Sequence, residues 1–131
     1  MSRTSTTSGS PYETSIGFCR AVRVGHTIVV SGTGPIAADG TTANPGDAYG
    51  QAKRCLEIIA HAVTDLGGRM EDVVRTRIYL VHAEDWQEVG RAHGEVFASI
   101  KPAATMVVVK ELLVKDWLVE IEAECILQHS P

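Results

Sequence analysis

The sequence is poor in aromatic residues, in clustered positive charge and in long apolar runs. Aromatic side chains make up 5% of the chain, and the formal net charge is −4 at pH 7. Binding to a phosphate backbone needs clustered lysine and arginine, which this sequence does not show, so we expect no nucleic-acid partner. No apolar run approaches the roughly 20 residues that cross a bilayer, so we also expect no membrane partner.

The cysteines are few and widely spaced. Cys19, Cys55 and Cys125 form no Cys-x-x-Cys motif and no Cys/His cluster. This spacing indicates neither a zinc site nor a disulfide framework. Each cysteine falls within an apolar pattern, which favours buried free thiols. We therefore expect no metal and no other cofactor.

The length of 131 residues is typical of one domain, and a hydrophobic content of 44% is ordinary for a globular protein. Residues 1–14 are rich in serine and threonine and lack an apolar core. We predict that they form a flexible N-terminal arm rather than a secretory signal. Residues 15–131 are predicted to form a single domain, and we expect the protein to be cytoplasmic.

Apolar periodicity predicts five strands and two helices. Strand-like runs at residues 20–24 and 27–31 flank a two-residue Gly-His connection that suits a tight hairpin turn. Small and apolar residues recur at steps of three and four over residues 48–66, which predicts a helix. The remaining predicted elements are a strand at 73–81, a helix at 84–99, and strands at 105–110 and 118–127. The order ββ-α-β-α-ββ predicts an α+β domain in which both helices cover one face of the sheet.

The opposite face of this sheet is predicted to be charged. Glu120, Glu122 and Glu124 alternate with apolar residues along the last strand. Arg75 and Arg77 share one face of the strand at 73–81. These charges would lie either in water or in a subunit interface. Because the first two strands are apolar on both faces, we favour burial by another subunit.

The hairpin register predicts a polar cluster with one aromatic wall. Opposed residues of a hairpin share a sheet face, with Cβ atoms about 4.5–5.5 Å apart. Counting outward from the turn pairs Arg20 with Ser31 and Phe18 with Thr33. The candidate ligand-binding residues of the hairpin are therefore Phe18, Arg20, Ser31 and Thr33.

Three short motifs, in a fixed order and spacing, resemble those of a known family. They are Val-Ser-Gly at 30–32, Pro-Ala-Ala-Thr at 102–105 and Val-Glu-Ile-Glu-Ala at 119–123. With the element order, they resemble the RidA/YjgF family, also labelled endoribonuclease L-PSP, over residues 16–127. The resemblance implies a chorismate-mutase-like fold, a homotrimer with small-molecule clefts between subunits, and hydrolysis of reactive enamines and imines.

The resemblance also implies a departure from the family in the tract at 102–106. Active members carry an arginine that holds the substrate carboxylate, and Ala104 stands at that position. Met106 stands where the family has a cysteine, and a methionine cannot act as a nucleophile. A backbone amide near Thr105 is a further candidate for holding an anionic group. We therefore predict a divergent member with weak or absent 2-iminoacid deaminase activity.

Other roles that the resemblance implies fall on the hairpin and on the last strand. Phe18 corresponds to the family's pocket tyrosine, and Ser31 corresponds to its pocket serine. Glu120 corresponds to the glutamate that helps to activate the attacking water, which makes it the catalytic candidate. Desolvation raises the pKa of a carboxyl group in a half-buried cleft, and a raised pKa suits general acid–base chemistry.

Two features of the helix at 84–99 are open to more than one interpretation. Gly90, which stands at a family asparagine, and Gly94 indicate either close packing or a widened cavity. His93 lies on the apolar stripe, where we favour a satisfied core or interface histidine over a catalytic base.

The roles of Arg20 and of the whole protein also stay open on the sequence alone. Arg20 either replaces the missing arginine as a carboxylate anchor or forms a structural salt bridge to a glutamate of the neighbouring subunit. The protein is either a divergent hydrolase of imines, enamines or related small molecules, or a non-catalytic ligand-binding or regulatory trimer. The negative net charge disfavours RNA cleavage.

Overall fold

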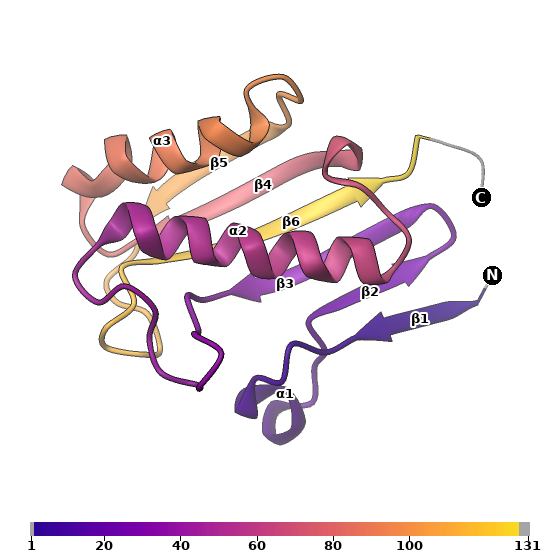
Figure 1. Ribbon diagram of the computed structural model, residues 1–131, viewed down its shortest axis with the longest axis horizontal. Coiled ribbons are helices and arrows are strands. Elements are labelled where there is room, and N and C mark those ends of the chain that lie inside the picture. The colour runs from indigo at the N-terminus through magenta and orange to yellow at the C-terminus, as the bar shows by residue number, and fades with distance from the viewer. Residues whose placement is uncertain (1, 129–131) are drawn as a thin grey trace.

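A six-stranded sheet carries two long helices on one face (Figure 1). The structure is a computed structural model, and it describes residues 2–128. The strands are β1 (Arg3–Thr6), β2 (Ala21–Val24), β3 (Thr27–Thr33), β4 (Val73–Leu80), β5 (Ala103–Val108) and β6 (Val119–Ile126). The helices are α1 (Pro11–Ile16), α2 (Ala48–Asp65) and α3 (Trp86–Phe97), with the 3₁₀ turns η1 (Met70–Asp72) and η2 (Ala83–Asp85).

The strand order is β1-β2-β3-β6-β4-β5, and every neighbouring pair is antiparallel except β4 and β5. The chain has to return to the same end of the sheet to form a parallel pair, and α3 makes this crossover. From β2 to β6 the elements follow the predicted order ββ-α-β-α-ββ. The prediction of an α+β domain is therefore confirmed.

The N-terminal segment differs from the flexible arm predicted for residues 1–14, because two elements form within or beside it. Strand β1 pairs antiparallel with β2 along its whole length. Helix α1 begins after Ser10, whose hydroxyl accepts a hydrogen bond from the backbone N–H of Tyr12, and ends at Gly17 with φ of 92°. The polar residues of β1 show no alternation that would reveal a strand. The Ser-Pro start and the glycine end of α1 are genuine helix signals, and the composition of the segment obscured them.

The core lies between the sheet and the helices α2 and α3. Fully buried apolar side chains include Ile28 on β3, Ile78 on β4, Ile121 on β6 and Ile59 on α2. Each such side chain stabilises the fold by about 1.5–3 kcal/mol relative to an exposed position. Packing of this layer fixes the positions of β3 and β6, which carry most of the candidate site.

A bulge in β3 changes the face on which its last residues lie. The ladder between β2 and β3 follows the predicted register from the turn as far as Ala21 and Val30. The pairing of β3 with β6 then shifts between Val30 and Thr33. Thr33 is consequently buried, like the residues that face the helices. The predicted pair of Phe18 with Thr33 is not part of the ladder, because β2 begins only at Ala21.

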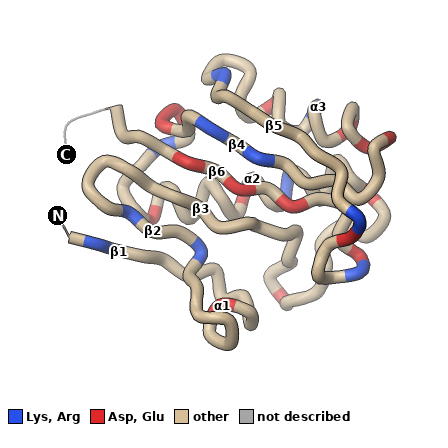
Figure 2. Tube along the Cα trace, turned by 180° about the vertical axis from the view of Figure 1, so that it is seen from behind, with Lys and Arg blue, Asp and Glu red and all other residues tan. Residues whose placement is uncertain are grey.

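The sheet face that points away from the helices is charged, as the sequence predicts. Figure 2 shows acidic residues along β6 beside basic residues of β4. The Arg77 guanidinium lies 3.1 Å from the Glu122 carboxylate and 2.9 Å from the Glu124 carboxylate. These side chains are between 28% and 40% exposed, so solvent screens each ion pair and its contribution to stability within one chain is small.

Candidate functional site

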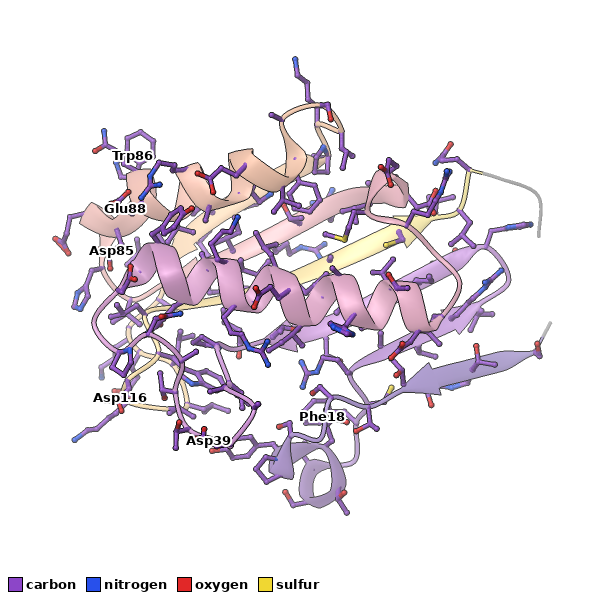
Figure 3. The ribbon with its side chains drawn as sticks, viewed as in Figure 1. Phe18, Asp39, Asp85, Trp86, Glu88 and Asp116 are labelled. Carbon is purple, nitrogen blue, oxygen red and sulfur yellow. The ribbon has the colours of Figure 1, made fainter. Side chains whose placement is uncertain are left out.

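A cavity of about 230 Å³ lies at the end of β3. Its walls come from the segment around α1, the end of β3 and the loop that follows it, α2, and the loop before β6. Figure 3 shows Phe18 beside α1 and Asp116 on the loop before β6, on two sides of this region. Segments far apart in the sequence therefore enclose one small volume.

The cavity brings together half of the predicted site residues. Those that line it are Phe18, Arg20, Thr33 and Glu120. Ser31 is not among the described lining residues, because its hydroxyl donates a 2.8 Å hydrogen bond to the Cys19 carbonyl oxygen instead. Ser31 stays close to Arg20 through its backbone N–H, which donates to the Arg20 carbonyl oxygen.

The other predicted residues, Ala104, Thr105 and Met106, lie on β5, away from this cavity. Strands β6 and β4 separate β5 from β3. At roughly 4.8 Å per strand, β3 and β5 are about 14 Å apart within one chain, and β6, which carries Glu120, is about 10 Å from β5. Ala104 and Thr105 are exposed, whereas Met106 is half-buried against the core. Within one chain, the predicted site is therefore divided between two parts of the sheet.

Glu120 is the acidic residue of the cavity wall. Burial raises the pKa of its carboxyl group, the positive charge of Arg20 lowers that pKa, and Glu122 raises it further, with a net upward shift. A Cβ atom on Gly32 would lie only 3.0 Å from Glu120 Oε1. The glycine of the Val-Ser-Gly motif therefore lets this carboxyl group lie directly against the β3 backbone. A carboxyl group with a raised pKa beside a cavity can accept and return a proton.

Arg20 is buried, and all three of its guanidinium nitrogens have partners. Nε donates to Ser8 Oγ at 3.2 Å, and one terminal nitrogen donates to the Gly32 carbonyl oxygen at 2.6 Å and to Thr33 Oγ1 at 3.1 Å. The other terminal nitrogen lies 3.5 Å from Glu13 Oε2. Arg20 thus forms a salt bridge within its own chain, whereas the sequence-based alternative placed the glutamate on a neighbouring subunit.

Glu13 is a partner of Arg20 that the sequence analysis missed. Its carboxylate accepts hydrogen bonds from Thr7 Oγ1 at 2.6 Å and from the hydroxyl and backbone N–H of Ser8. Burial alone would raise the pKa of Glu13, but these hydrogen bonds and the Arg20 charge lower it. The network joins α1 to the end of β3 and so fixes the wall that carries Tyr12. The signal in the sequence was an acidic residue in the first turn of a capped helix.

Trp117 forms another wall that the sequence analysis missed. A Cβ atom on Gly34 would collide with the Trp117 ring, so the indole packs directly on this glycine. The buried Gln51 of α2 holds the loop, because its amide donates to the Asp116 carbonyl oxygen and accepts from the Leu118 N–H. A glutamine on the buried face of a predicted helix was the available signal for this contact.

The β5 side of the molecule has open space beside α3. A Cβ atom on Gly90 or on Gly94 would meet no described atom within 4 Å, so these glycines do not mark close packing within the chain. His93 shares a 2.9 Å hydrogen bond with Thr76, which pairs with Ala104 across the parallel ladder. Burial lowers the pKa of His93. The favoured interpretation of His93 as a satisfied histidine agrees with this contact.

Within residues 2–128, no group of three or more His, Cys, Asp or Glu side chains is placed to hold a metal ion. Cys55 and Cys125 are buried and free, and burial raises the pKa of the Cys125 thiol to about 12.

In the part of the chain that the structure describes, no helix is both long and apolar enough to cross a membrane.

The sheet order, the helices on one face and the cavity at the end of β3 define a single-domain α+β protein with a cavity of small-molecule size. The family model described as endoribonuclease L-PSP matches residues 9–126. The chain therefore belongs to this family, the RidA/YjgF family that its motifs resemble.

Known relatives support both the family and the fold. The uncharacterized protein SCO2049 of Streptomyces coelicolor is 40% identical over 117 residues, which cover 89% of this chain and 87% of the relative. The 3-aminoacrylate deaminase RutC of Acinetobacter baylyi is 31% identical, over 77% of this chain and 79% of RutC. The crystal structure of Rv2704 from Mycobacterium tuberculosis, a member of the YjgF/YER057c/UK114 family, matches with a TM-score of 0.86 at 40% identity, covering 96% of this chain and 100% of that chain.

Proposed function

We propose that this protein is a RidA-like homotrimer that binds a small molecule between subunits and hydrolyses an imine, an enamine or a related compound. Its similarity to a 3-aminoacrylate deaminase supports this class of reaction. The division of the predicted site supports the trimer, because Glu120 and Ala104 lie on separate parts of one sheet. In a closed ring of identical subunits, the β3 side of one subunit can meet the β5 side of the next.

The observation that carries the proposal is the Glu120 carboxyl group, which lines a cavity and has a raised pKa. In the proposed reaction, Glu120 accepts a proton from water while the water oxygen bonds to the imine carbon. This proton then passes to the imine nitrogen, which gives a carbinolamine. Glu120 next takes the proton of the carbinolamine hydroxyl group and delivers it to the nitrogen as the carbon–nitrogen bond breaks. The products are a carbonyl compound and ammonia, so atoms and charges balance. General acid–base catalysis of this kind contributes about 10²–10⁴-fold to a rate.

The alanine at position 104 limits the substrates of this reaction. A charge-assisted hydrogen bond from an arginine to a carboxylate is worth about 1.5–3 kcal/mol. Without it, a 2-imino acid loses both affinity and orientation relative to the catalytic group. We therefore propose that ordinary 2-iminoacid deamination is slow in this protein and that another small molecule is preferred.

An oxidase-coupled imine assay tests the proposal. A Glu120→Gln variant is expected to lose at least about 100-fold of the catalysed rate. Glu124→Gln, on the same strand and bonded to Arg77, serves as the matched control and is expected to retain the rate. Equal activity of the two variants would contradict the role of Glu120. Sedimentation of the wild-type protein as a monomer would contradict the trimer.

A non-catalytic ligand-binding or regulatory trimer is the second candidate function. It is favoured by Met106 in place of a nucleophilic cysteine, and by Arg20, whose donors are already bonded within the chain. This candidate predicts saturable ligand binding with no turnover in the imine assay. RNA cleavage, which the family description names, conflicts with the net charge of −4.

A further inference from the structure

We propose that the cavity takes an apolar ligand that is uncharged or cationic and carries no carboxylate, because Glu13 neutralises the arginine in its wall. The inference rests on the proposed function only in treating this cavity as the ligand site. It adds the charge class of the ligand. The donors of Arg20, the charge balance of the lining and the apolar mouth support it independently.

The first support is that Arg20 has no guanidinium nitrogen without an acceptor. A carboxylate clamp needs parallel N–H donors that are available in the folded protein. Here Nε is bonded to Ser8, one terminal nitrogen to Gly32 and Thr33, and the other faces Glu13. The Arg20 side chain is only 5% exposed, so water does not compete for these donors. A ligand carboxylate would have to displace Glu13, which its own hydrogen bonds hold in place.

The second support is the charge balance around the cavity. The charged residues that line it are Arg20, Arg54 and Glu120. Each arginine has a glutamate partner, Glu13 for Arg20 and Glu57 for Arg54, the latter at 3.3 Å. Among the described residues, the Glu120 carboxyl group forms neither a hydrogen bond nor an ion pair. A ligand therefore meets a net charge of zero or −1, which repels an anion and attracts a cation.

The third support is the apolar character of the cavity and its mouth. Tyr12, Ile16 and Leu113 line it although they are 40%, 64% and 89% exposed. Phe18 and Trp117 add aromatic walls. An engineered apolar cavity of about 150 Å³ holds benzene. The present volume of about 230 Å³ therefore has room for an aromatic ring with a short polar arm.

Three probes with one ring and different charges test the inference on the full chain. Benzyl alcohol is neutral, benzylamine is cationic and benzoate is anionic at pH 7. In calorimetric titrations of the wild-type protein, we expect benzyl alcohol and benzylamine to bind at least about tenfold more tightly than benzoate. Benzoate that binds as tightly as benzyl alcohol would overturn the inference without any variant.

Two variants then locate the cause of the charge preference. Glu13→Gln removes the counter-charge of Arg20, so benzoate affinity is expected to rise about tenfold while benzyl alcohol affinity stays constant. Glu120→Gln leaves the Arg20 contacts intact, and we expect it to lower the affinity for benzylamine relative to that for benzyl alcohol. This second variant keeps the inference testable if Glu13→Gln does not fold. Glu88→Gln is the control, because Glu88 is an exposed residue of α3 far from Phe18 (Figure 3).

The outcomes separate this inference from the proposed reaction. A preference for benzoate together with Glu120-dependent hydrolysis overturns the ligand class alone. The expected charge order without any hydrolysis overturns the proposed reaction alone and supports the binding function. Binding of none of the three probes overturns the cavity as a ligand site and with it both proposals. An unchanged charge preference in Glu13→Gln and Glu120→Gln alike also overturns the ligand class.

Discussion

The end of β3 and the edge strand β5 carry the two halves of the proposed site, and they differ in how their polar groups are arranged. At the end of β3, Arg20 and Glu13 are buried and bonded to each other, next to the Glu120 carboxyl group. On β5, Ala104 is exposed and carries no polar side chain. The first half combines a proton-transfer group with apolar walls, whereas the second lacks the charge that a carboxylate ligand needs.

Under the proposed function, this difference means that membership of the family does not transfer a complete site. In the β3 half, Arg20 and Glu13 belong to a buried network whose polar groups are bonded to one another, so the loss of either one is expected to destabilise the fold. The β5 half is exposed in one chain, and a substitution there changes the ligand at little cost in stability. Under the proposed function, a chain with this fold can therefore lose the carboxylate-binding residue on β5 and still keep the acid–base residue near β3.

The largest expected effect comes from removing the buried arginine. Arg20→Gln leaves Glu13 as an uncompensated buried charge, and the free energy of unfolding is expected to fall by about 3–5 kcal/mol. Arg77→Gln removes an exposed arginine with two carboxylate partners, and we expect a much smaller loss, because exposed ion pairs contribute little to stability. Urea unfolding of both variants measures the difference. Similar losses in the two variants would show that the Arg20 network is not a structural unit.

The second prediction restores the missing charge on β5. Ala104→Arg is expected to increase the rate of 2-iminoacid hydrolysis about tenfold, because a guanidinium returns to the position where the family resemblance implies a carboxylate-binding arginine. Ala103→Arg is the matched control, since Ala103 is also exposed but its side chain points to the opposite sheet face. A gain in both variants would indicate general electrostatic attraction rather than a specific clamp.

The smallest expected effect concerns stability and pH. The folded-state pKa of Glu120 is raised above its ordinary value of 4.5, so its ionisation destabilises the fold as the pH rises through that pKa. Glu120→Gln should therefore raise the melting temperature at pH 7 and lose this advantage below about pH 4.5. Glu13 has the opposite sign, because its lowered pKa stabilises the fold above pH 4.5 and this contribution is lost as the pH falls. Melting curves across pH 3–8 test both signs.

Much of the fold could be predicted from the sequence because its elements are strongly periodic. Steps of three and four residues identified α2, and β-branched residues identified β4. The polar strand β1 gave no such signal, since its side chains do not alternate between apolar and polar. Its stability comes from pairing with β2, which is a tertiary effect that local patterns do not report.

The candidate site could be predicted only in part. Motif resemblance located Glu120 and Phe18, and hairpin counting brought Arg20 close to Ser31. Hairpin counting assumes a regular register, so it could not reveal the bulge in β3. The extra residue of the bulge moves the side chains beyond it to the opposite sheet face. The partner of Arg20 was also unpredictable, because Glu13 lies in a segment whose helix was missed.

The central claim is that this site keeps the acid–base group and lacks the carboxylate clamp. The most direct test compares two imines with the same phenyl side chain, one made by an amine oxidase from phenethylamine and one made by an amino-acid oxidase from phenylalanine. Only the second carries a carboxylate. The account predicts that the wild-type protein accelerates hydrolysis of the first imine more than that of the second, relative to the spontaneous rates. A greater acceleration for the carboxylate-bearing imine would contradict the account.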